Sequence, residues 1–172
     1  TLSTRLDDKD AWKWHFCGVA HYFLEQYEQA IECFERGIDC HLKNGTNNTP
    51  PERDCIFMAY LHMGEKDKAL ASIAGITADT PVEKGDLMYL KRCLLYTGQT
   101  SIDDFDQDID RTMAKRIITE LYGAVVYCHW IAGDDQRAAG YLKEILAVEE
   151  DHHAFGYKMA LQDKATWAKD LL

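Results

Sequence analysis

The stretch from Trp14 to Ile38 constrains the fold of this chain most, because it reads as two amphipathic helices joined by a short turn. Apolar and small residues recur there every three or four positions, the spacing that places side chains on one face of a helix. The members of the two faces are Trp14, Cys17, Gly18 and His21, then Tyr27, Ala30, Ile31, Phe34 and Ile38. Two such faces on antiparallel neighbours bury each other, so the segment predicts a helical hairpin.

The second half of this hairpin pattern returns twice along the chain. The matching residues are Tyr60, Gly64, Ala69, Ile73 and Ile76, and later Trp130, Gly133, Ala138, Leu142 and Ile145. Gly98 lies between them, so the glycines expected between paired helices are about 34 residues apart. The interval from Ala30 to Ala69 is longer, which fits a lengthened loop in the Gly, Thr and Asn stretch at 45–49. The pattern therefore predicts a tandem helical repeat.

The hairpin resembles the tetratricopeptide repeat family, whose pattern is Trp, Leu-Gly, an aromatic residue, Ala and Phe. Its places are held here by Trp14, Gly18, Tyr22 or Tyr27, Ala30 and Phe34. Cys17 stands where the family prefers Leu. The resemblance implies an all-α fold, a right-handed helical-hairpin solenoid covering nearly the whole chain. It also implies an interaction scaffold with a concave groove, and no chemistry.

We expect a single domain over residues 1–172, built of about four helix pairs and a capping helix. The expected units are 11–44, 50–83, 84–118 and 119–152, with the cap at 153–172. The third unit departs from the pattern, because an Asp takes its small Ala position. The expected helices lie near 10–24, 27–43, 50–63, 66–77, 81–97, 101–113, 115–132, 135–149 and 154–171.

Two helix starts carry the same local signal. Thr49 and Thr80 each precede a proline, and a glutamate follows three residues after each threonine, at Glu52 and Glu83. A threonine cap, a proline in the first turn and a glutamate that reaches back to the cap are typical of a helix N-terminus. We therefore expect repeat helices to begin at both places.

The charge and composition bound the class of partner. The net charge is −10, which argues against nucleic acid or an anionic membrane as the main partner, because both require a concentrated basic face. No apolar run of about 18 residues exists, so no membrane insertion is expected. Six cysteines without a CxxC spacing are typical of small buried hydrophobes in a reducing compartment, which predicts a cytoplasmic protein. Because the chain starts at Thr1 rather than Met, we expect it to be a processed product or a piece cut from a longer protein.

The motifs that could indicate a metal or catalytic site are better explained without one. Asp104, Asp106, Asp108 and Asp110 alternate like a calcium loop, but Ile109 takes the place of the required Gly. His152 and His153 are adjacent on the chain and do not chelate together on a helix. We therefore expect no catalytic residue, no metal ligand and no cofactor, and the chain is not expected to be an enzyme.

The outer side of the first helix of each unit is also apolar. In the resembled family this side faces the groove, and the residues placed there are Trp12, His15, Val19, Tyr22, Phe23, Met58, Leu61, His62, Arg92, Leu95, Tyr96, Tyr127, Trp130 and Ile131. A helix that is apolar all round has to be covered on both sides. Either the groove accepts an apolar partner, or the chain covers it itself, for example with the cap helix.

These observations leave two functional hypotheses. The first is a protein-protein interaction scaffold that binds an apolar or amphipathic peptide or helix in the groove. The second is a structural or regulatory module that packs on another domain of a longer chain, or self-associates as a homo-oligomer. Some members of the resembled family bind acidic peptide tails through a clamp of Lys, Asn and Arg on the groove face. Here those places hold residues such as Trp12, His15 and Asp54, so a clamp for acidic tails is not expected.

Overall fold

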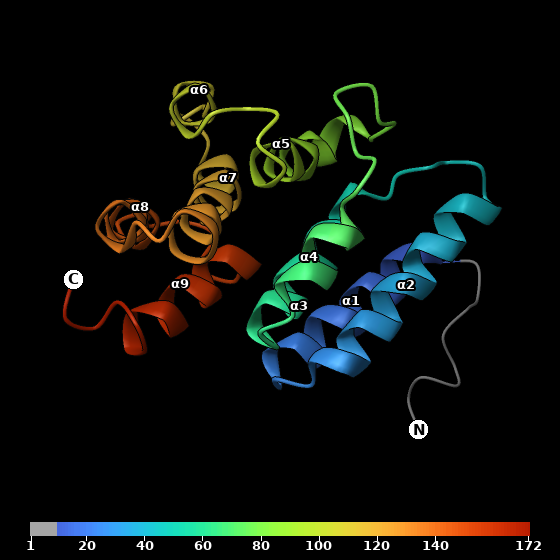
Figure 1. The fold of residues 1–172 in the computed structure, drawn as a ribbon, viewed down its shortest axis with the longest axis horizontal. Coiled ribbons are helices and arrows are strands. Elements are labelled where there is room, and N and C mark those ends of the chain that lie inside the picture. Colours follow the sequence, from blue (N-terminus) through green and yellow to red (C-terminus); the bar gives the residue numbers. More distant parts are fainter. Residues whose placement is uncertain (1–9) are drawn as a thin grey trace. The chain divides into compact units, whose positions relative to one another are not determined.

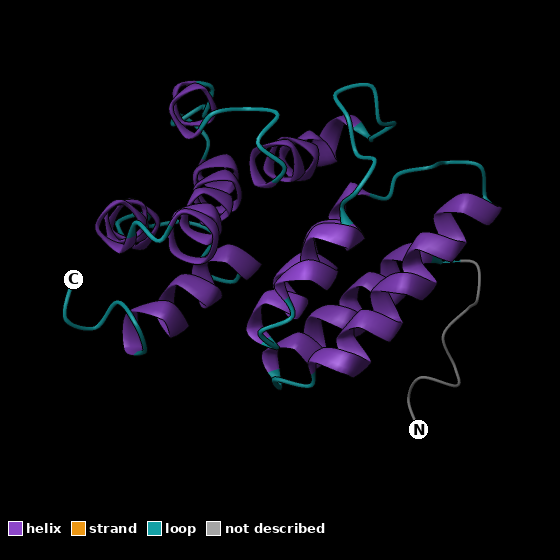
Figure 2. Ribbon diagram, in the orientation of Figure 1, coloured by secondary structure: helices purple, strands orange, loops and turns teal. Residues whose placement is uncertain are grey.

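A computed structural model describes residues 10–172, and this part of the chain is helical with no strand (Figure 1; Figure 2). Residues 1–9, part of the domain range expected from the sequence, lie outside the described residues. The α-helices are α1 (Ala11–Phe23), α2 (Tyr27–Lys43), α3 (Pro50–His62), α4 (Lys66–Ser72), α5 (Leu87–Tyr96), α6 (Ile102–Gln107), α7 (Ala114–Val126), α8 (Asp135–Leu146) and α9 (Phe155–Ala165). Among the described residues, none of these helices has the length and apolarity needed to cross a membrane.

The chain divides into two compact units, and the boundary between Cys93 and Leu94 falls inside α5. In the first unit, α1 packs on α2, α2 on α3 and α3 on α4, and these four helices run side by side in Figure 1. In the second unit, α7 packs on both α8 and α9, and α6 contacts α7. A π-helical turn (Tyr127–Ala132) continues α7.

The first unit is organised around a close approach of α1 and α2. Gly18 lies against the Phe34 ring so tightly that an added Cβ would sit 2.5 Å from Phe34 Cε1. Phe34 and Ala30 are fully buried beside it, as the hairpin pattern predicted. A glycine is therefore needed at position 18, since any larger side chain would have to displace an aromatic ring from a packed core.

The hairpin turns share one hydrogen-bond pattern. The second residue after the first helix of each pair has positive φ, at Glu25, Gly64 and Gly98, with values of 58°, 75° and 73°. In each turn its N–H bonds to the carbonyl three residues back, and the next N–H bonds to the carbonyl five residues back. Gly133 also has positive φ, at the end of the π-helical turn. Gly64 and Gly98, two of the three glycines expected between paired helices, thus hold equivalent turn positions, whereas the turn at Gly133 has a different hydrogen-bond pattern.

The existence of all nine predicted helices is confirmed, but three of them end five or six residues early, at Ser72, Gln107 and Ala165, and α8 ends three residues early, at Leu146. The end of α4 shows the cause. The Ser72 hydroxyl donates to the Ala69 carbonyl (2.7 Å), and Arg53 of α3 donates to the Ser72 carbonyl (2.7 Å). Contacts of this kind satisfy the last carbonyls of a helix and let the chain leave it.

The two threonine-proline signals have different outcomes. Helix α3 does begin at Pro50 with Thr49 as its cap residue, but Glu52 turns into the core instead of reaching back to the cap. No helix begins at Pro81. The chain instead forms a 3₁₀ turn (Lys84–Asp86) before α5, because the Glu83 N–H donates to the side chain of Asn48 (3.1 Å), which holds the segment extended. The expected helix start at Pro81 is wrong.

Candidate functional site

The fourteen residues predicted to line the groove fall into three groups by their solvent exposure in the structure. Seven are buried: His15, Tyr22, Met58, Leu61, Arg92, Leu95 and Tyr96. Five are partly exposed: Val19, Phe23, His62, Tyr127 and Ile131. Trp12 and Trp130 are exposed at 38% and 37%. The exposed aromatic anchors expected of a binding surface are therefore fewer than the sequence pattern suggested.

Tyr22 is part of the core of the first unit instead of a surface anchor. Its ring packs edge-on against Tyr27 and His62, with centroids 5.3 Å and 5.6 Å away, and it is 2% exposed. His62 in turn stacks on Tyr27 at 5.2 Å. This aromatic cluster joins α1, α2 and α3, so truncation of Tyr22 would unfold the unit before it reported on binding.

Arg92 has a structural role in place of the predicted groove role. Its Nε lies 3.0 Å from Asp54 Oδ1, and the two side chains are 1% and 0% exposed. A second guanidinium nitrogen donates to the Met58 sulfur at 3.1 Å. A buried cation and carboxylate tolerate burial only as a pair, so Arg92 ties α5 to α3 inside the first unit.

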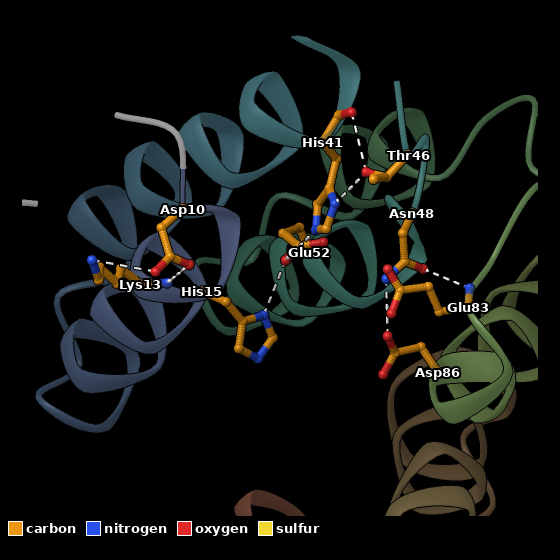
Figure 3. A network of polar contacts seen from close by, with 9 residues as sticks. All are labelled: Asp10, Lys13, His15, His41, Thr46, Asn48, Glu52, Glu83 and Asp86. Atoms are coloured by element: carbon orange, nitrogen blue, oxygen red, sulfur yellow. Dashed lines mark hydrogen bonds and ion pairs between the residues drawn. The ribbon is translucent and has the colours of Figure 1, made fainter. Parts of the chain in front are cut away.

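Glu52 is the centre of a second buried polar network (Figure 3). Its Oε1 accepts a hydrogen bond from His15 Nδ1 of α1 (3.3 Å) and lies 3.8 Å from His41 Nε2 of α2. His41 Nδ1 is 2.9 Å from the Thr46 hydroxyl. All three ionisable side chains are buried. The network joins α1, α2 and α3 through one carboxylate, and no local sequence signal identifies it, because its partners are far apart along the chain.

Charge within this network shifts two pKa values in opposite directions. The neighbouring Glu52 carboxylate raises the pKa of His41 above its ordinary value of 6.5, although burial opposes the shift. Burial by itself raises the pKa of Glu52, but the two histidines outweigh it and leave that pKa below the ordinary value of 4.5. The folded unit therefore favours a charged Glu52 beside a protonated His41.

We expect this pair to make stability depend on pH. The raised His41 pKa contributes stability that is complete below pH 6.5 and lost as the pH rises through the raised value. The lowered Glu52 pKa contributes stability present above pH 4.5 and lost as the pH falls through the lowered value. Both contributions coexist from pH 4.5 to 6.5, where Glu52→Gln should cost most, about 1–3 kcal/mol.

Urea midpoints of the wild type and of Glu52→Gln, measured within pH 4.5 to 6.5 and on both sides of that range, check this prediction. The control is Glu35→Gln, on the exposed side of α2, which should follow the wild-type pH profile within about 0.5 kcal/mol. Equal losses for Glu52→Gln at every pH would contradict the charge pair and leave only a packing role for Glu52.

The candidate binding surface is a stripe on the outer face of α1, which we call the aromatic stripe: Trp12, Phe16, Val19 and Phe23. These residues are spaced three and four apart, so they lie in one line along the helix. Phe16 is 65% exposed and its ring centroid lies 6.3 Å from that of Trp12. The buried His15 ring contacts both, at 5.2 Å and 5.8 Å. The groove prediction omitted Phe16, the most exposed member.

His15 links the aromatic stripe to the interior. Its ring contacts Trp12 and Phe16 on one side, and its Nδ1 bonds to the buried Glu52 on the other. The ring is thereby fixed under the two exposed aromatic residues. A surface whose support is locked in this way loses little side-chain entropy when it binds.

In the second unit, Trp130 is the exposed predicted residue. Its ring meets His129 edge-on at 4.9 Å, and His129 stacks on Trp167 at 4.0 Å. His129 Nδ1 is also 2.7 Å from Asp135 Oδ1 of α8. Of these three rings, that of Trp130 is the most exposed, whereas the stripe on α1 presents two exposed aromatic rings one turn apart.

Comparisons of this chain with protein-family models, with curated proteins and with solved structures return no match. Its function is therefore inferred from its own residues. The aromatic stripe offers a line of apolar contacts, which suits association with another apolar surface.

Proposed function

We propose that this chain is a protein-protein interaction scaffold whose aromatic stripe binds an amphipathic helix of a partner. The observation that carries the proposal is that α1 is apolar on both faces. Lys13 is its single Lys, Arg, Asp or Glu, whereas the outer face of the neighbouring α2 is rich in charge. One face of α1 packs on α2 through Trp14, Gly18 and Tyr22. The other presents Trp12 and Phe16 to solvent, which has a cost unless a partner covers them.

The shape of the stripe favours a helical partner. Its four residues extend over about 16 Å of helix, since α1 rises about 1.5 Å for each residue. A partner helix with apolar residues every three or four positions presents a matching line of side chains over three turns. The contacts on this line are apolar, so affinity should depend only weakly on salt.

We propose a right-handed superhelix of tetratricopeptide type as the architecture of the scaffold. The repeated turn at Glu25, Gly64 and Gly98 supports it, as does the position of the small residues that follow. Ala30, Ala69 and Ala138 each donate the N–H that closes the first turn of a second helix, and each is 0% exposed. Equivalent small residues at equivalent places are what tandem repeats need where paired helices cross closely.

We expect Trp12→Ala and Phe16→Ala each to weaken partner binding by at least about tenfold, since exposed aromatic anchors cost about 2 kcal/mol when truncated. The melting temperature should change little, because both rings lie at the surface, with Phe16 65% and Trp12 38% exposed. Amphipathic helical peptides selected by display on the wild-type chain supply the ligand, and titration of each variant measures the loss. Leu42→Ala, an apolar residue 53% exposed on α2, is the matched control and should bind normally.

The runner-up function is a structural or regulatory module, in which the stripe is covered by another domain of a longer chain or by a second copy. Light scattering after size exclusion separates the scaffold from the self-associating module. The scaffold is supported if the wild type is a monomer and the selected peptides bind more weakly to both Trp12→Ala and Phe16→Ala. Concentration-dependent association that Phe16→Ala abolishes would instead show that the stripe is a self-association face, and the peptide proposal would fail.

A further inference from the structure

Three side chains that commonly bind transition metals converge on the α1–α2 hairpin. Cys17 and His21 lie one turn apart on α1, and Cys33 faces them from α2. One ligand atom from each lies within 4.8 Å of the other two, and the Cys17 and Cys33 sulfurs are 2.8 Å apart. Cys33 is buried, whereas Cys17 and His21 are partly exposed. The cluster is thus anchored in the core and open at one side.

The hairpin itself brings the three together. Cys17 precedes Gly18, whose close contact with the Phe34 ring sets the separation of the two helices, and Cys33 precedes Phe34. Cys17 and Cys33, which each precede a residue of that contact, are thereby held face to face. His21 follows Cys17 by four residues, so it lies on the same helix face.

We propose that Cys17, His21 and Cys33 form a Zn²⁺ site with two thiolate ligands, one imidazole ligand and a fourth position open to solvent. Two sulfurs and one imidazole nitrogen select zinc over the hard cations Mg²⁺ and Ca²⁺, which prefer oxygen. Three protein ligands with an accessible fourth position are the arrangement of an open zinc site, in contrast to closed four-ligand structural sites.

The geometry requires only a small side-chain adjustment. Zinc–sulfur bonds of about 2.3 Å place two thiolates on one tetrahedral ion about 3.8 Å apart. The sulfurs at 2.8 Å therefore have to separate by about 1 Å, which rotation of the partly exposed Cys17 side chain can supply.

A hydrogen bond outside the three ligands orients the imidazole. His21 Nδ1 donates to Gln26 Oε1 at 2.7 Å, which places the lone pair of the neutral ring on Nε2. Zinc-binding histidines almost always donate their other ring N–H to an oxygen in this way. Gln26 is the residue immediately before α2, so the turn of the hairpin fixes both this bond and the approach of Cys33.

Zinc has to displace protons from the thiols. Burial, with the Cys17 thiol beside it, raises the pKa of Cys33 to about 12, so this thiol is protonated at neutral pH before the ion arrives. A zinc-bound thiol is deprotonated outright, and binding therefore releases protons. The open side formed by Cys17 and His21 gives both the ion and the released protons a route to solvent.

Metal titration of the whole chain under a non-thiol reductant tests the site. Zinc is measured by competition with a colorimetric chelator, and Co²⁺ by the near-ultraviolet charge-transfer band that thiolate coordination produces. We expect one equivalent of either ion, and Cys17→Ser or Cys33→Ser should abolish the band. His21→Gln should weaken zinc binding at least about tenfold and change the cobalt spectrum. Gln26→Leu should weaken it about 10–100-fold by loosening the imidazole.

The matched control is Cys40→Ser, because Cys40 lies two turns after Cys33 on the same buried face of α2 but outside the cluster. It should bind like the wild type. Circular dichroism verifies that each variant is folded. If Cys33→Ser does not fold, the test rests on His21→Gln, since His21 is partly exposed and its replacement disturbs the core less. A wild-type chain that takes up no ion, or unchanged affinity in His21→Gln, overturns the proposal. If the chain takes up no metal but forms a Cys17–Cys33 disulfide when a peroxide is added, the two cysteines are a redox dithiol pair and not zinc ligands.

Discussion

Replacing Arg92 with methionine is expected to lower the free energy of unfolding of the first unit by about 3–5 kcal/mol, the usual effect of removing one partner of a buried ion pair. The cause is Asp54, whose carboxylate lies 3.0 Å from Arg92 and is 0% exposed. Without the guanidinium it would be either a charge without a counter-charge in the core, or a carboxyl that has to take up a proton. Urea denaturation measures the loss.

A double variant separates this electrostatic effect from packing. Asp54→Leu with Arg92→Met replaces both charges by apolar side chains, and such exchanges are often neutral or stabilising. We expect the double variant to recover most of the stability that Arg92→Met loses. Lys66→Met, at the exposed start of α4, is the control for removing a positive charge and should change stability by less than about 0.5 kcal/mol. A double variant as unstable as the single one would contradict the argument.

Deleting residues 154–172 is expected to unfold or aggregate the second unit. Helix α9 packs on α7 and α8. The Tyr122 hydroxyl donates to Asp163 Oδ2 at 3.1 Å, and Trp167 stacks on His129. Removing α9 would expose the buried residues of α7 beneath it, and a terminal helix of a stack is needed to cover its neighbours. Size exclusion and calorimetry check the result, and a shortened chain that stays monomeric and equally stable would show that α9 is not a cap.

Two glycines offer a sharper test of the same contact. An added Cβ at Gly156 of α9 would lie 2.8 Å from the Ile118 carbonyl oxygen, so Gly156→Ala should push α9 off α7 and destabilise the unit by about 1–3 kcal/mol. At Gly140 of α8 an added Cβ meets nothing within 4 Å, so Gly140→Ala should instead stabilise the helix by about 0.5–1 kcal/mol. Opposite signs for the two substitutions are the expected outcome.

The sequence predicted the helices because their signals are local. Side-chain spacing marked the faces, and the positions of Gly64, Gly98 and Gly133 marked the turns, where the backbone adopts positive φ. Helix ends were less predictable. Whether α4 stops at Ser72 depends on Arg53, and whether a helix starts at Pro81 depends on Asn48; both partners come from elsewhere in the chain.

The candidate site was likewise predictable from the sequence only in part. The sequence by itself determined that α1 is apolar on two faces, and so indicated a surface that needs covering. It could not determine which of those residues stay exposed, because an apolar side chain has the same spacing in a core as on a surface. Only the tertiary structure decided that Tyr22 and Arg92 are interior and that Phe16 is not. It also decided that Glu52 meets two histidines and that Cys33 meets Cys17 and His21, since such pairings are set by how helices pack and not by their spacing along the chain.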